Sequence, residues 1–136
     1  MTTRTTWEAL AQRCREATGP DRQLDADIQR MFDGRACFRP GIGWKRWWPE
    51  TSRWGYLEPV TGKIDAIVSL IEKTLPGWWW ELESFVARSD SIDSKPRAVI
   101  GHYDRAGETK GEAKTPALAL CAAYCMARAG MEDDTP

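Results

Sequence analysis

The 136-residue sequence has one histidine and four cysteines, and neither residue type forms a pattern that carries chemistry. Every mechanism that needs an imidazole would have to use His102. The cysteines contain no pair with the two-residue spacing of zinc knuckles and thioredoxin-type sites. Glycine-rich nucleotide-binding motifs and the HExxH zinc motif are missing too. We therefore expect a non-enzymatic protein with no catalytic residues, no metal site and no cofactor.

Long apolar runs and a strong charge of either sign are also missing. Nineteen basic and twenty acidic side chains leave a net charge of -1, which excludes a polybasic binder and an acidic disordered protein. No apolar run approaches the about 20 residues of a membrane span. No apolar stretch follows Met1, so no signal peptide is expected. These absences predict a cytoplasmic protein with no membrane partner.

Apolar residues at three- and four-residue steps predict four helices. The expected first residues, all good N-caps, are Thr5, Asp21, Thr61 and Thr115, and the helices end at Gly19, Asp33, Pro76 and Gly130. Asp25 lies next to the apolar residues that are expected to be buried along the second helix. Three roles are open for its carboxylate: a bond to Arg22, a bond to a backbone amide, or solvation.

The last helix is apolar on all sides, which indicates burial on both of its faces. Its core residues are expected to be Leu118, Cys121, Ala122 and Cys125, and Cys14 should be buried on the first helix. Two arrangements fit such a helix. It lies across a sheet beneath the N-terminal helices, or its second face forms a homodimer.

Two strands are predicted between the third and fourth helices, Trp78–Val86 and Arg97–Tyr103, paired antiparallel. Alternation places Trp78, Trp80, Leu82 and Val86 on one face of the first strand. The polar residues 104–114 read as a loop with a short edge. The fold class expected for residues 1–130 is therefore α+β: a single-domain α/β/α sandwich with a small, mainly antiparallel sheet. Residues 131–136 form an acidic tail expected to be disordered.

Residues 35–56 contain five basic residues, one acidic residue and six aromatic residues. Glycine and proline interrupt them, which favours an irregular insertion with a short strand near residues 54–57. Trp54 and Tyr56 are predicted to anchor it. The predicted partner-binding residues are Arg39, Lys45, Arg46, Trp47 and Trp48. The alternative is a lid with every tryptophan turned into the core.

Three short motifs carry a resemblance to a known family: Pro20 to Asp25 at a helix start, Ile64-Asp65-Ala66 before the Pro76-Gly77-Trp78 strand, and Thr115 to Ala123 near the C-terminus. Together they resemble the phage ABA sandwich domain family, from about Trp7 to Arg128. The resemblance implies an α/β/α sandwich and a phage or prophage origin. It assigns no functional residue, and residues 35–53 are longer and more basic than is usual in that family.

Three functions are compatible with these features. The first is a phage accessory protein that binds a host or phage protein, since tryptophan and arginine are enriched at interface hot spots. The second is a nucleotide or single-stranded nucleic-acid binder that uses residues 35–56, because cations meet phosphates and indoles stack on bases. The third is an enzyme that pairs Glu81 and Glu83 with His102. The first function fits the missing catalytic motifs and the weak overall charge best.

Overall fold

The computed structural model describes residues 3–33, 36–39, 43–48, 53–83, 96–104 and 107–132; among residues 32–56 it describes the backbone of these ranges and the side chain of Lys45. The elements in these ranges, in chain order, are α1 (Thr3–Glu16), α2 (Arg22–Asp33), β1 (Ala36–Arg39), β2 (Gly43–Trp48), β3 (Arg53–Tyr56), α3 (Ile64–Thr74), β4 (Trp78–Glu83), β5 (Arg97–His102), β6 (Glu108–Glu112) and α4 (Pro116–Met131). Residues 84–86 of the first predicted strand and 133–136 of the tail lie outside them.

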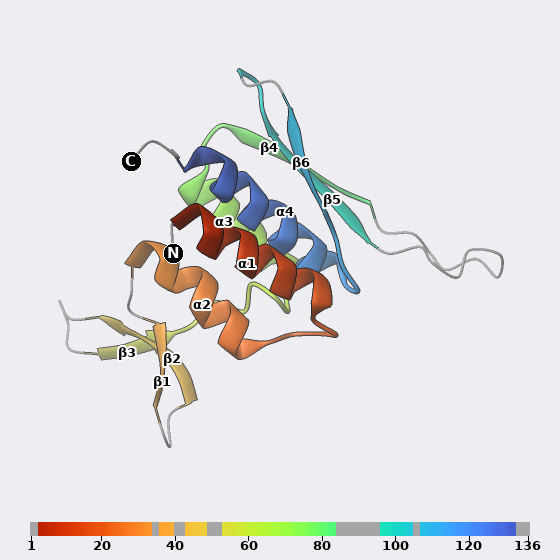
Figure 1. The fold of residues 1–136 in the computed structure, drawn as a ribbon. Helices are drawn as coiled ribbons and strands as arrows, with labels where there is room; N and C mark the ends of the chain where they lie inside the picture. The colour runs from red at the N-terminus through yellow and green to blue at the C-terminus, as the bar shows by residue number, and fades with distance from the viewer. Residues whose placement is uncertain are drawn as a thin grey trace.

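Helix α4 forms the centre of the fold (Figure 1). Helices α1 and α3 both pack against it, as do strands β5 and β6 of the sheet β4–β5–β6. Eleven of its residues, between Ala117 and Ala129, are buried. A helix that is apolar on every side needs such a place between two layers. The first arrangement predicted for this helix is therefore the one observed, and the homodimer considered for it has no open apolar face of α4 to use.

The fold class is α+β in one small domain with antiparallel sheets, as predicted. Within that class, α4 lies between the β4–β5–β6 sheet and α1 (Figure 1), and α3 packs against α4. The buried middle layer is thus a helix, and the described helices lie on one face of the β4–β6 sheet. No helix in the described ranges is long and apolar enough to cross a bilayer.

The β4–β5–β6 sheet confirms the predicted antiparallel pair and adds a third strand. β5 pairs with β4 on one side and with β6 on the other. On the face toward α4, Trp80 and Leu82 of β4 lie opposite Ile100 and Ala98 of β5, and both β5 residues are fully buried. The segment predicted as a loop with a short edge forms the five-residue strand β6. Its polar side chains misled the prediction, because an edge strand with one open face tolerates them.

Gly111 allows β6 to lie directly against α4. A Cβ atom at this position would come within 2.5 Å of the Ala123 amide nitrogen and 3.0 Å of the Ala122 Cβ. Thr109, two residues earlier on β6, bonds α4 as well, with its hydroxyl 3.3 Å from the Ala123 carbonyl oxygen. Small residues on both partners therefore set the distance between the sheet and the central helix.

Strands β1, β2 and β3 form a second antiparallel sheet below α2 (Figure 1). The prediction of an irregular segment was therefore wrong over residues 36–39, 43–48 and 53–56. Gly43 begins β2 with φ at +87°, a left-handed conformation that suits glycine. The glycines and prolines that suggested an irregular chain thus include one that starts a strand.

Candidate functional site

The five residues predicted to bind a partner all fall in the β1–β2–β3 sheet. Arg39 is the last residue of β1, and the other four, Lys45 to Trp48, follow one another in β2. Lys45 is opposite Cys37 of β1 and Tyr56 of β3. Trp47 is opposite Trp54. The sheet therefore brings the predicted binding strand next to the predicted anchor strand.

The side chain of Lys45 is half-buried. The side chains of the other four predicted binding residues, Arg39, Arg46, Trp47 and Trp48, and of the predicted anchors, Trp54 and Tyr56, lie outside the described part of the structure. The division into anchors and binding residues therefore stays a prediction. The backbone register does establish that both groups belong to one sheet.

The three strands of this sheet concentrate the positive charge of the chain. They contain four basic residues, Arg39, Lys45, Arg46 and Arg53, and no acidic residue. The whole chain has a net charge of -1, so the rest of it carries -5. A charge separation of this size creates a local positive field that favours acidic partners. It was masked in the overall composition, where the two signs nearly cancel.

Helix α2 connects this sheet to the body of the protein. Both β1 and β2 contact α2, whereas the β4–β6 sheet lies on the far side of the helical layers (Figure 1). Immediately after β3, Leu57 is fully buried against Ala26 of α2. The helix that the backbone of β1 and β2 contacts is therefore α2.

Polar side chains of α2 hold the chain that leaves the sheet. The guanidinium group of Arg22 donates to the Leu57 carbonyl oxygen at 2.7 Å. The Gln29 side-chain amide donates to the Glu58 carbonyl oxygen at 2.9 Å. A carboxylate oxygen of Asp25 accepts from the Thr61 amide at 2.8 Å and from the Thr61 hydroxyl at 2.6 Å. These bonds satisfy buried polar groups and fix the segment 57–61 on α2.

Asp25 combines two of the roles that the sequence left open. It is 1% exposed, and its second carboxylate oxygen accepts from Arg22 at 2.8 Å. Burial raises the pKa of this carboxyl above its ordinary value, although the bonds from Thr61 and Arg22 act in the opposite direction. Each polar group around Asp25 belongs to the connection between α2 and the segment 57–61, which makes its role structural.

The prediction that Thr61 caps α3 was wrong. The N-cap is Lys63, whose side chain makes no capping bond. The Thr61 hydroxyl instead bonds Asp25 and accepts from the Asp21 amide at 2.8 Å. It thus links the start of α2 to the start of α3. By contrast, Thr115 caps α4 as predicted, since its side chain accepts from the Leu118 amide.

The three motifs that carry the family resemblance meet at one cleft of about 370 Å³. Pro20 from the first, Ile64 and Asp65 from the second, and Thr115 to Ala117 from the third line it. Their convergence follows from architecture, because the motifs start helices that come together at this end of the molecule. Sequence reasoning identified these residues and did not foresee that they adjoin.

Glu81, Glu83 and His102 are not brought together. Glu81 and Glu83 lie opposite Val99 and Arg97, whereas His102 is opposite Trp78 at the other end of the strand pair. The His102 ring packs edge-on against Trp78, with ring centroids 5.2 Å apart, and its Nδ1 accepts from the Asp104 amide at 3.0 Å. The register therefore removes the geometry that an acid–base site with these residues needs.

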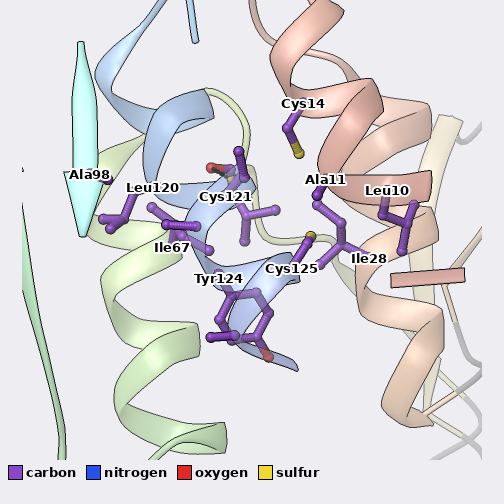
Figure 2. Packing of buried hydrophobic residues seen from close by; sticks show 14 of the residues in the cluster. Leu10, Ala11, Cys14, Ile28, Ile67, Ala98, Leu120, Cys121, Tyr124 and Cys125 are labelled. Carbon is purple, nitrogen blue, oxygen red and sulfur yellow. Dashed lines mark hydrogen bonds between the residues drawn. The ribbon is translucent and has the colours of Figure 1, made fainter. Parts of the chain in front are cut away.

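Cys14, Cys121 and Cys125 are buried where α1 meets α4, as predicted (Figure 2). The Cys121 thiol donates to the Val60 carbonyl oxygen at 3.0 Å. Burial raises the pKa of the thiols of Cys121 and Cys125 well above the ordinary value, so both stay protonated. In the described residues, no group of three potential ligands is placed to hold a metal ion. These cysteines are core residues.

Comparison of the chain with protein-family models, with curated proteins and with solved structures gives no match.

Proposed function

We propose that this chain is a small phage- or prophage-encoded accessory protein that acts without catalysis, in the cytoplasm of the host cell, by binding a partner protein through the β1–β2–β3 sheet. The phage origin rests on the sequence resemblance alone. The binding role rests on the sheet. Its composition, with three tryptophans, one lysine and one arginine in β2, is typical of interface hot spots.

The observation that carries this proposal is the position of the sheet. The backbone of β1 and β2 contacts α2, whereas α4 packs against α1, α3 and the β4–β5–β6 sheet. Polar bonds from Arg22, Asp25 and Gln29 fix the segment that follows β3. This connection supports the sheet as a separate platform.

The test is to capture partners with tagged protein from host lysate, before and after infection, using two matched variants. Trp47→Ala with Trp48→Ala should lose a specific partner that wild-type protein retains. Tyr103→Ala should retain it, because Tyr103 is an exposed aromatic residue, 80% accessible, away from the sheet. A partner that both variants capture equally would contradict the proposal.

The nucleic-acid alternative is separated by a second arm of the same experiment. Titration of a labelled single-stranded oligonucleotide at low salt should show no binding by wild-type protein. Binding that weakens steeply as salt rises, and that Trp47→Ala with Trp48→Ala abolishes, would favour the alternative. The two arms use the same proteins, so the outcomes are directly comparable.

A further inference from the structure

The β4–β5–β6 sheet ends in two edge strands. Within the described residues, β5 has a strand on each side, whereas β4 and β6 each have a strand on one side only. An edge strand directs the N–H and C=O groups of alternate residues away from its sheet, where they can pair with another chain. Proteins block an edge with charged side chains, proline, a bulge or a covering helix. The two edges of this sheet differ in how far they are blocked.

Strand β6 is a blocked edge. Three of its five residues, Glu108, Lys110 and Glu112, are charged and exposed, and none is a large apolar residue. Helices α4 and α1 both contact β6, and Gly111 brings its backbone directly against α4. A strand added to β6 would meet charges on one face and helices on the other, so this edge is unsuited to pairing.

In the described part of the chain, β4 is an open edge with an apolar face. Its six residues include three tryptophans and a leucine, and none is proline or a basic residue. On the face toward α4, Trp80 is opposite Ile100 of β5, and Leu82 is opposite Ala98. The two β5 residues are fully buried, whereas Trp80 and Leu82 are half-buried, although all four pack in the same apolar cluster. The difference follows from position, because only β5 has a strand on both sides.

Helix α4 leaves room for a further strand beside β4. It packs mainly against β5 and β6, and it contacts β4 least of the three strands. A strand can therefore be added at the β4 edge without displacing α4. That strand would have to be apolar on the face toward the helices, and on the outer face it would have to avoid placing a carboxylate opposite Glu81.

We infer that β4 pairs antiparallel with β4 of a second copy of this chain, which joins two three-stranded sheets into one of six strands around a two-fold axis. Residues directly opposite each other in such a pair point to the same face. The apolar faces of the two copies therefore become continuous in registers that place a β4 residue opposite itself. The inference uses a different sheet from β1–β2–β3, so it is independent of the proposed function.

The sequence of β4 selects one of these registers. With Trp80 opposite Trp80 of the second copy, Trp78 lies opposite Leu82 on the apolar face. On the outer face, Trp79 then lies opposite Glu81. A register centred on Glu81 would bring two carboxylates directly opposite each other, which is destabilising. A register centred on Trp79 would shorten the paired segment by two residues. The strand is therefore complementary to itself in the Trp80-centred register.

The contact is small, so the dimer should be weak. Residues 78–82 span about 17 Å, and a sheet layer is about 10 Å thick, so each copy buries about 170 Å² along the edge. Stable complexes bury about 800 Å² on each partner, so this dimer should form only at high protein concentration. It should also stop at two copies, because a two-fold contact uses the same surface of both partners.

Sedimentation velocity over a wide range of protein concentrations tests the inference. The average mass of wild-type protein should rise from that of the monomer toward that of the dimer, and no further. A protein that remains monomeric at every concentration would overturn the inference. A mass that rises beyond the dimer would also overturn it, since a closed two-fold contact cannot extend.

Two substitutions of Trp79 test the pairing on the outer face. Trp79→Glu would place a carboxylate opposite Glu81 of the second copy, twice in each dimer, whereas Trp79→Lys would place an ammonium group there. Both variants remove the indole that lies over Gly101, so the loss of that contact is common to them. The Trp79→Lys variant should therefore dimerise at least about tenfold more tightly than Trp79→Glu. Equal association of the two would contradict the pairing.

A double variant identifies the register. In Trp79→Glu with Glu81→Lys, the two new charges have opposite signs, and they face each other across the dimer when Trp80 is at the centre. This variant should recover the association that Trp79→Glu loses. In a register centred on position 81, two lysine side chains would face each other instead. A double variant that associates as weakly as Trp79→Glu alone would overturn the inferred register.

The matched control is Lys110→Gln. It lowers the net charge by one unit, as Trp79→Glu does, at an exposed position on the other edge strand. It should dimerise like wild-type protein. A control that loses association would overturn the inference in favour of a nonspecific charge effect. Circular dichroism establishes that each variant is folded.

Hydrogen exchange of wild-type protein decides the outcome even if the Trp79 variants fail to fold. Exchange of the β4 amides should slow as the protein concentration rises, and exchange in β6 should stay constant. Slower exchange in β6 instead, or in neither strand, would overturn the inference. Protection of β4 that appears only when another protein is added would overturn it too and assign the edge to that protein. Trp47→Ala with Trp48→Ala should dimerise like wild-type protein, which keeps this result separate from the proposed function.

Discussion

Among the described glycines, Gly111 is the position where an added methyl group should be most damaging. The added Cβ would lie 2.5 Å from the Ala123 amide nitrogen and 3.0 Å from the Ala122 Cβ, and it would also contact the Ala119 carbonyl oxygen. Two of these three atoms belong to the backbone of α4, so no rotamer change relieves the contact. Relief requires β6 and the central helix to separate by about 1 Å, which disrupts the packed layer between them.

The expected cost is about 3 kcal/mol, the upper end of the range for overpacked cores. A smaller entropic gain of about 0.4–1 kcal/mol, from the restricted unfolded chain, opposes it. Since a domain of this length has a total stability of about 7–20 kcal/mol, the variant should still fold. Its urea midpoint should fall by about 1.5 M, for a slope of about 2 kcal/mol/M.

Gly130→Ala is the matched control for this prediction. Gly130 is exposed in the last turn of α4, and no atom lies within 4 Å of its added Cβ. Alanine is the better helix former, so this variant should be stabilised by up to about 1 kcal/mol. A Gly111→Ala variant that loses less than about 1 kcal/mol would refute the close approach of β6 to α4.

Three further outcomes are expected. Asp25→Ala should cost about 3–5 kcal/mol in urea unfolding, because it leaves the buried donors of Thr61 unpaired, whereas Asp25→Asn keeps an acceptor and should cost about 1 kcal/mol. Because burial raises the pKa of Asp25, protonation of this carboxyl favours the folded state. This contribution to the free energy of unfolding is present at low pH and is lost as the pH rises through the folded-state pKa. Asp25→Asn should remove this pH dependence. Burial raises the pKa of Tyr124 from 10.0 to about 12, so stability should fall as the pH rises between these values, and Tyr124→Phe should abolish that alkaline loss in pH-dependent melts. In a Cys37→Ser variant, the three buried thiols should react with a thiol reagent only as fast as the protein opens, and rapid labelling would contradict their burial.

The helices were predictable from sequence because their apolar residues repeat with the helical period. Trp7, Leu10 and Cys14 are buried along one side of α1, and Leu24 and Ile28 along one side of α2. The starting residues were less predictable. Thr61 has the right chemistry for an N-cap, but Asp25, 36 residues away in sequence, takes its hydroxyl. A contact between distant residues thus overrides a local preference.

The β1–β2–β3 sheet was not predictable in the same way. Its strands are four to six residues long, and glycine and proline lie between and within them. Such residues are typical both of irregular chain and of the tight ends of short strands, so local pattern does not distinguish the two. What decides is pairing between strands, for example Trp47 with Trp54.

The composition of the candidate site could be read from the sequence, and its placement could not. Basic and aromatic residues in segment 35–56 suggested a binding surface. Its position on α2, away from the core, depends on bonds such as Arg22 to Leu57. The open outer face of the β4–β5–β6 sheet, which includes Trp79, was predicted only in part. Alternation indicated that this face was partly exposed, but only the layer order shows that the described helices all lie on the opposite side.

The unfolding free energy of the Trp47→Ala, Trp48→Ala double variant tests most directly the claim that the β1–β2–β3 sheet is a surface platform outside the core. Truncation of one buried tryptophan costs about 3–5 kcal/mol, and Trp7→Ala, at a residue that is 0% exposed, supplies that reference in the same protein. The account predicts that the double variant loses less than about 1 kcal/mol, as surface substitutions do. A loss as large as that of Trp7→Ala would contradict it and identify the segment as a lid over the core.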